Sequence, residues 1–241
     1  MKKSAFFLAA LCSGTLLLAS CNGDKAADTT ATGTTSTTMA MDSAASGDLA
    51  GMDHSQMGAG AAGASPQMAA MTAMMGKMAT GKPKGNTDHD FAHHMLEHHK
   101  GAVAMADIQL RDGKDATMRR MAEQIKADQL KEITALEAAA IRLDSAPTNY
   151  QPNDPADPFT SKMKASMDGM MQNMPKPVAN PDMNFNMLMT VHHQSAVDMA
   201  KAELAHGKDT KLKEMAQQMI TAQEKEIAAF KDWHNKNGDK M

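Results

Sequence analysis

Cysteine is nearly absent from this chain of 241 residues, and both examples, Cys12 and Cys21, lie close to the N-terminus. Aromatic residues are also scarce, with six Phe, one Trp and one Tyr. The formal net charge is −3, which excludes the basic surface typical of nucleic-acid-binding proteins. The sequence lacks a glycine-rich phosphate loop, a nucleophile elbow and a zincin His-Glu-x-x-His motif. We therefore expect neither an enzyme nor a nucleic-acid partner.

The N-terminus carries the pattern of an export signal. Lys2 and Lys3 precede an apolar stretch from Ala5 to Leu18, which is too short to span a bilayer, since about twenty residues are needed. The sequence that ends at Cys21 resembles the lipobox of bacterial lipoproteins, in which the cysteine is lipidated. Residues 1–20 are thus predicted to be a lipoprotein signal peptide. We expect an exported, periplasmic protein anchored in a membrane by lipid, with the outer membrane favoured.

Removal of the signal takes away Lys2, Lys3 and Cys12, which changes the formal charge from −3 to −5. With Cys21 committed to lipid, the folded part has no thiol, so soft-metal ligands have to be Met or His. The chain contains 26 Met. Methionine fills cores and also binds soft metals, so composition alone does not decide its use.

Residues 21–87 are predicted to be a disordered tether rich in Thr, Ala, Gly and Met. Its Met52, His54 and Met57 resemble the Met/His repeats of periplasmic copper-resistance proteins, although a single copy also arises by chance. The methionines at positions 68, 71, 74, 75 and 78 have helical spacing, which predicts a short helix used for packing.

The rest of the chain is organised around an internal repeat. Residues 91–137 align without a gap to residues 185–231, with twenty identities in forty-seven positions. Each copy predicts two helices separated by a glycine, Gly113 or Gly207, which we expect to end the first helix in a left-handed conformation. Asp115 and Asp209 are expected to cap the second helices. A repeat of this length is one supersecondary unit used twice.

The fold class that follows is all-α. Each helical hairpin buries its apolar face only against the other, which predicts a ferritin-like four-helix bundle with a long Pro/Met-rich crossover. The bundle covers residues 88–236: repeat one is 88–143, the crossover is 144–181 and repeat two is 182–236. Methionines at helical spacing predict one short helix inside the crossover.

Two pairs of adjacent histidines are the candidate metal ligands. His99 and His193 fall in the middle of the apolar stripe of their helices, and His98 and His192 fall on its flank. Methionines lie one turn before and two turns after on the same side, and the first repeat adds one further histidine. The predicted metal ligands are therefore His98, His99, His192, His193, Met95, Met105, Met189, Met199 and His94.

The alternative is that these histidines and methionines only pack. Against it, both pairs recur at the same place in the repeat, and each buried imidazole would need a hydrogen-bond partner. Gln129, Gln223, Glu132 and Glu226 either orient the ligands or lie on a solvated helix flank, and the flank is the simpler interpretation.

Imidazole and thioether without thiolate favour copper, as Cu(I) in preference to Cu(II). Because a bound imidazole is neutral, we expect copper affinity to fall as the pH drops through about 6.5. A ferritin-like di-metal redox enzyme needs Glu-x-x-His pairs on two helices. The repeats supply only Glu203 with His206, so this alternative is weakly supported.

The pattern Phe-x3-Met-x2-His-His-x2-Ala-Val-x-Met-Ala, followed by a glycine and a Gln-x2-Glu-Ile helix, resembles domain-of-unknown-function family 305. The resemblance covers Asp88 to His234. It implies an exported, ferritin-like helical protein with a role in copper binding or tolerance, since some members bind copper. The family's positions correspond to His98, His99, Met105, His192, His193 and Met199.

These observations together predict a periplasmic, lipid-anchored protein that sequesters copper or hands it to an accepting protein. The competing interpretations are the di-metal enzyme and a metal-free structural or interaction lipoprotein.

Overall fold

The computed structural model describes residues 65–238, and this part of the chain consists of six helices without a strand. The helices are α1 (Pro66–Thr80), α2 (Thr87–Asp112), α3 (Ala116–Arg142), α4 (Pro158–Gln172), α5 (Pro181–His206) and α6 (Thr210–Asn237). The all-α prediction is confirmed. Residues 1–64, which include Cys21, Met52, His54 and Met57, lie outside the described residues.

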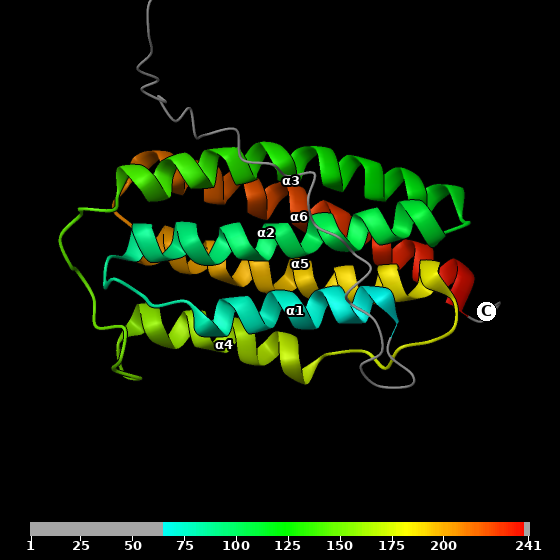
Figure 1. The fold of residues 1–241 in the computed structure, drawn as a ribbon, viewed down its shortest axis with the longest axis horizontal. Helices are drawn as coiled ribbons and strands as arrows, with labels where there is room; N and C mark the ends of the chain where they lie inside the picture. The colour runs from blue at the N-terminus through cyan, green and yellow to red at the C-terminus, as the bar shows by residue number, and fades with distance from the viewer. Residues whose placement is uncertain (1–64, 239–241) are drawn as a thin grey trace, which may run out of the picture. The chain divides into compact units, whose positions relative to one another are not determined.

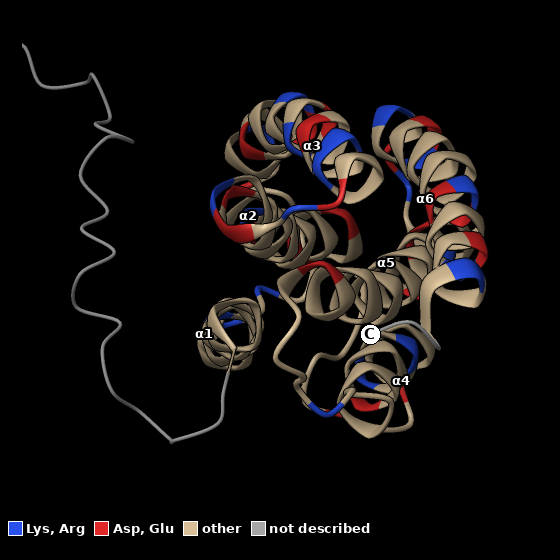
Figure 2. Ribbon diagram, turned by 90° about the vertical axis from the view of Figure 1, so that its right-hand side faces the viewer, with Lys and Arg blue, Asp and Glu red and all other residues tan. Residues whose placement is uncertain are grey.

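The two predicted hairpins, α2–α3 and α5–α6, pack together through α2 and α5, which form the middle of a helical bundle (Figures 1 and 2). The helices α3 and α6 lie on one side of this central pair. On the other side lie α1, packed on α2, and α4, packed on α5. Because they are covered from both sides, α2 and α5 supply most of the fully buried residues, including the four paired histidines.

The helices α1 and α4 extend the repeat to three helices per unit. Aligned from Pro66 and Pro158, they are identical at five of fifteen positions, and both begin with a polar cap followed by proline. Their methionines Met71, Met78 and Met170 are buried in the shared core. The folded unit therefore begins by Ser65, whereas the sequence predicted a tether up to residue 87 with only a short helix in it.

The turns inside the two hairpins are equivalent. Asp115 and Asp209 accept backbone hydrogen bonds at the starts of α3 and α6, as predicted. The prediction of left-handed glycines is wrong, since Gly113 and Gly207 have φ of −70° and −63°. Glycine is needed there for space: a Cβ would lie 2.1 Å from the side chain of Gln109 or Glu203, which folds beneath the turn.

The central helices are fixed to each other by a reciprocal pair of aspartates. At the start of α2, Asp88 accepts hydrogen bonds from the backbone N–H groups of Lys208 and Asp209 in the turn of the second hairpin, at 2.8 and 2.6 Å. At the start of α5, Asp182 accepts from the backbone of Lys114 in the turn of the first hairpin, at 3.1 Å. Each hairpin thus holds the turn of the other, which sets the register of α2 against α5.

No helix within residues 65–238 combines the length and the apolar character needed to cross a bilayer.

The docking of α1 on α2 generates a stability prediction. A Cβ at Gly101 would lie 2.4 to 2.8 Å from Sδ, Cγ and Cβ of Met74, so both helices would have to shift. Gly101→Ala is expected to lower the free energy of unfolding by about 1–3 kcal/mol, as overpacking does. Chemical denaturation of both proteins measures the difference.

The matched control is Gly76→Ala on the open side of α1, where a Cβ meets nothing within 4 Å. This variant is expected to gain up to about 1 kcal/mol, because alanine favours helix. Equal effects of the two substitutions would contradict close packing at Gly101.

Candidate metal centre

His98 of α2 and His192 of α5 meet where the two central helices cross. Their ring centres are 3.7 Å apart with an angle of 34° between the planes, and both side chains have no solvent exposure. His192 Nε2 lies 3.0 Å from the backbone oxygen of His98 and donates to it. Both nitrogens of His98, and Nδ1 of His192, have no hydrogen-bond partner in the protein. The fold therefore brings together His98 and His192, which occupy equivalent positions in the two repeats.

These two imidazoles are neutral at neutral pH. Burial lowers the pKa of His98 well below its ordinary value, and the neighbouring His192 lowers it further. Burial likewise lowers the pKa of His192, with a further contribution from His193. The expectation of proton competition near pH 6.5 holds for ordinary imidazoles, whereas this pair stays neutral through that range and keeps lone pairs available to a ligand.

His99 and His193 each lie beside a glutamate of the neighbouring helix. His99 Nε2 lies 2.7 Å from Glu132 Oε2 of α3, and His193 Nε2 lies 2.9 Å from Glu226 Oε2 of α6. Both rings are fully buried. Glu132 accepts a hydrogen bond from His99 Nε2, which places the proton there and leaves Nδ1 unpaired in the interior, as in metal-binding histidines. The approach of Glu226 to His193 does not have hydrogen-bond geometry, so both nitrogens of His193 are without a hydrogen-bond partner. The simpler interpretation of these glutamates as a solvated flank is wrong.

The buried amides add further unpaired polar groups. Gln129 and Gln223 are 3 % and 2 % exposed, and both have side-chain atoms without a partner. The recurrence of Gln-x2-Glu-Ile in both repeats was the sequence signal for this inward face. Helical spacing alone does not distinguish this inward face from a solvated one.

The four predicted methionine ligands are buried without solvent exposure on the same two helices: Met95, Met105, Met189 and Met199. His94 differs from them, because it is half-buried and donates Nδ1 to the backbone oxygen of Asp90 at 3.0 Å. Among residues 65–238, no three His, Asp, Glu or Cys side chains are already arranged around one ion.

Glu203 lies beneath the turn between α5 and α6, where Asp88 holds that turn. It is fully buried beneath Gly207. Burial raises the pKa of Glu203 to about 9, and the nearby Asp88 contributes to the shift. The neutral carboxyl of Glu203 lies close to Asp88, and at the equivalent place in the first repeat the amide of Gln109 donates to Asp182 at 2.5 Å. A protonated acid in this role is a poor ligand for iron.

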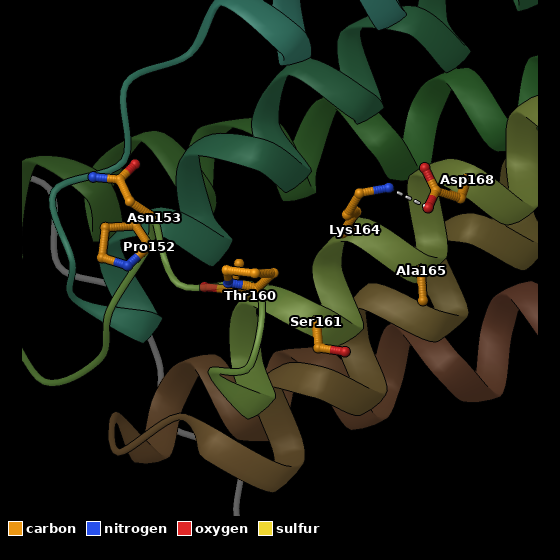
Figure 3. A pocket seen from close by; sticks show the side chains of 8 residues that line it. Pro152, Asn153, Thr160, Ser161, Lys164, Ala165 and Asp168 are labelled. Carbon is orange, nitrogen blue, oxygen red and sulfur yellow. Dashed lines mark hydrogen bonds and ion pairs between the residues drawn. The ribbon is translucent and has the colours of Figure 1, made fainter.

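One surface hollow lies away from the paired histidines. It has a volume of about 320 Å³ between the loop at Pro152 and the start of α4, and its charged groups are the ion pair Lys164–Asp168 (Figure 3). No histidine or methionine lines it. The candidate site is therefore the bundle interior.

The family DUF305, a domain of unknown function, matches residues 23–139 and again residues 88–234. Both copies of the His-His motif lie within these matches. The chain belongs to the DUF305 family. No functionally curated protein matches it.

Several solved structures are similar to this DUF305 chain. CopM in its Cu(I)-bound form is 23 % identical with a TM-score of 0.48, covering 62 % of this chain and 96 % of CopM. A DUF305 fragment from Deinococcus radiodurans is 26 % identical with a TM-score of 0.47, covering 64 % and 99 %. A DUF305 protein from Streptomyces coelicolor is 25 % identical with a TM-score of 0.49, covering 65 % and 96 %.

The protonated Glu203 generates a pH prediction. Its pKa is about 9 in the folded protein against an ordinary value of 4.5. As the pH rises through this window, the unfolded chain loses a proton that the folded protein keeps, so stability falls. Glu203→Gln removes that loss and is expected to raise the free energy of unfolding at pH 7.5 by about 2–4 kcal/mol, with little change below pH 4. Urea unfolding across the pH range measures both values.

The opposite substitution at the equivalent position of the first repeat, Gln109→Glu, serves as the control. It places an acid beside Asp182 and should make the free energy of unfolding more dependent on pH. If Glu203→Gln shows the pH dependence of the unaltered protein, the carboxyl is not held neutral.

Proposed function

We propose that this protein is an exported, lipid-anchored copper-binding protein that takes up Cu(I) at the centre of its helical bundle. One observation carries the proposal. Four fully buried histidines from two related helices have nitrogens without hydrogen-bond partners in the protein, namely both nitrogens of His98 and of His193, and Nδ1 of His99 and His192. Buried polar groups normally have partners, so unpaired nitrogens gathered in one interior favour a ligand.

The donor set favours a soft ion. Imidazole nitrogens and the sulfurs of Met95, Met105, Met189 and Met199 are the ligands available on α2 and α5, and such ligands favour Cu(I). Glu132 accepts from His99 Nε2 and so favours the tautomer whose Nδ1 is free for a metal, and Glu226 lies 2.9 Å from His193 Nε2. Copper is cargo in this proposal, and its binding requires no catalytic step.

The two competing functions explain these residues less well. A metal-free bundle gives no reason to keep unpaired imidazoles where leucine would pack, since unpaired buried groups cost stability. A di-metal redox enzyme needs inward carboxylates that are charged, whereas burial raises the pKa of Glu203 to about 9 and keeps its carboxyl neutral. Binding without catalysis is the function that these residues support best.

The cellular role that follows is copper sequestration, copper tolerance or handover to an accepting protein. Lipidation at Cys21 would place the bundle at the periplasmic face of a membrane, with the outer membrane favoured. Met52, His54 and Met57 would collect copper at low affinity and pass it to the bundle. These parts of the proposal rest on the sequence.

Anaerobic Cu(I) titration of the full chain against a competing chelator, with Zn²⁺ and Fe²⁺ as controls, tests the proposal. Replacing His98, His99, His192 and His193 with Leu is expected to abolish the tightest Cu(I) binding. Glu132→Gln with Glu226→Gln should weaken it by about 10–100-fold, as loss of a ligand's orienting partner does.

The methionines allow a matched comparison. Replacing the four buried methionines of α2 and α5 with Leu conserves volume and should lower Cu(I) affinity while the fold is kept. The same change at Met71, Met78, Met163 and Met170, which are buried in α1 and α4, should leave affinity unchanged. Unaltered Cu(I) binding by the four-histidine variant would exclude the proposed centre.

A further inference from the structure

A second group of histidines lies at the start of α2, away from the central four. His89 and His93 are one helical turn apart, and their ring centres are 4.6 Å apart. A metal lies about 2 Å from each imidazole nitrogen that binds it, so two rings this close are able to share one ion. Asp144, which follows α3, places Oδ1 3.9 Å from His89 Nε2. Imidazoles and a carboxylate thus meet at one end of the bundle.

His89 has the hydrogen bonding of a metal ligand. Its Nδ1 lies 2.8 Å from Asp90 Oδ1 and donates to this carboxylate. Asp90 is itself held by the backbone N–H groups of Lys84 and Gly85 and by the Tyr150 hydroxyl, at 2.7 to 2.9 Å. The arrangement fixes the proton on Nδ1. It leaves His89 Nε2 buried and without a hydrogen-bond partner, on the side of His93 and Asp144.

The second repeat has different chemistry at the same place. The counterparts of His89 and His93 are Met183 and Met187, and the counterpart of Asp144 is Gly238. The two halves of the bundle share a backbone, but the second has two thioethers where the first has the imidazoles of His89 and His93. Such ligands favour divalent ions of intermediate softness, and Cu²⁺ binds them more tightly than Zn²⁺.

We propose that His89, His93 and Asp144 form a second metal site, which takes a divalent ion, with Cu²⁺ preferred to Zn²⁺. His89 is nine residues before His98, about 13 Å along the helix, so the site is separate from the central one. The proposal does not depend on Cu(I) binding at the centre.

Asp144 completes the site by rotation. No three ligands of this kind are already arranged around one ion in the described chain, and Asp144 is paired with the ammonium group of Lys84. Its side chain is 68 % exposed and is therefore free to turn towards the two imidazoles. Lys84 competes with the ion for this carboxylate.

Aerobic Cu²⁺ titration of the full chain, followed by electron paramagnetic resonance, tests the site. The variant His89→Met with His93→Met copies the residues of the second repeat. It is expected to lose one equivalent of Cu²⁺ with nitrogen hyperfine structure. The variant with Leu at the four central histidines should keep this equivalent, which separates the present proposal from the central site. Thermal unfolding by circular dichroism checks that each variant folds.

Substitutions at two exposed residues provide an independent measure of Cu²⁺ binding if the double variant does not fold. Asp144→Asn is expected to weaken Cu²⁺ binding by about tenfold, and Lys84→Met is expected to strengthen it by freeing the carboxylate. If the folded double variant keeps the equivalent, or if both exposed variants bind Cu²⁺ as the unaltered protein does, the site does not exist.

Discussion

The reciprocal hydrogen bonds of Asp88 and Asp182 are the constraint on which the rest of the structure depends. Each carboxylate, at the start of one central helix, accepts from the turn of the opposite hairpin. The two locks lie at opposite ends of the α2–α5 pair, so neither helix is able to slide or rotate without breaking backbone hydrogen bonds. The contacts at the helix ends therefore set the register of α2 against α5, and the residues between the ends are not needed to set it.

Because the helix ends set the register, the centre of the bundle tolerates buried polar groups that would otherwise destabilise the fold. Unpaired buried nitrogens destabilise a fold unless other contacts hold it together. Here the turn locks and the six-helix core supply those contacts, while α1 and α4 cover the face of α2 and α5 opposite α3 and α6. The stacked rings of His98 and His192 are thus held at a crossing that the apolar core and the helix ends already define.

Much of this arrangement follows from the sequence, because a repeat at one fixed offset carries structural information that single residues do not. The two hairpins, the caps at Asp115 and Asp209 and the inward His-His pairs all recur at one offset. The helices α1 and α4 were not recognised as a third repeated element, because their offset is two residues shorter and prolines separate them from the hairpins. Glu132 lies at the border of two helix faces, where periodicity does not distinguish burial from exposure. His89 and His93 were missed because methionine replaces both in the second repeat.

Charge determines which ion suits which part of the molecule. The central donors are neutral, since burial keeps His98 and His192 uncharged and thioethers carry no charge. In the proposed centre a monovalent ion would bring a single charge into this interior, and the carboxylates of Glu132 and Glu226, which lie 2.7 and 2.9 Å from His99 and His193, would help to balance it. A divalent ion would bring twice the charge to the same neutral ligands, and the cost of removing it from water rises steeply with charge. The start of α2 suits the divalent ion better, because the carboxylate of Asp144 lies next to it and is exposed to solvent. If both proposed sites exist, the bundle would separate a soft, monovalent environment from a harder, divalent one along a single helix.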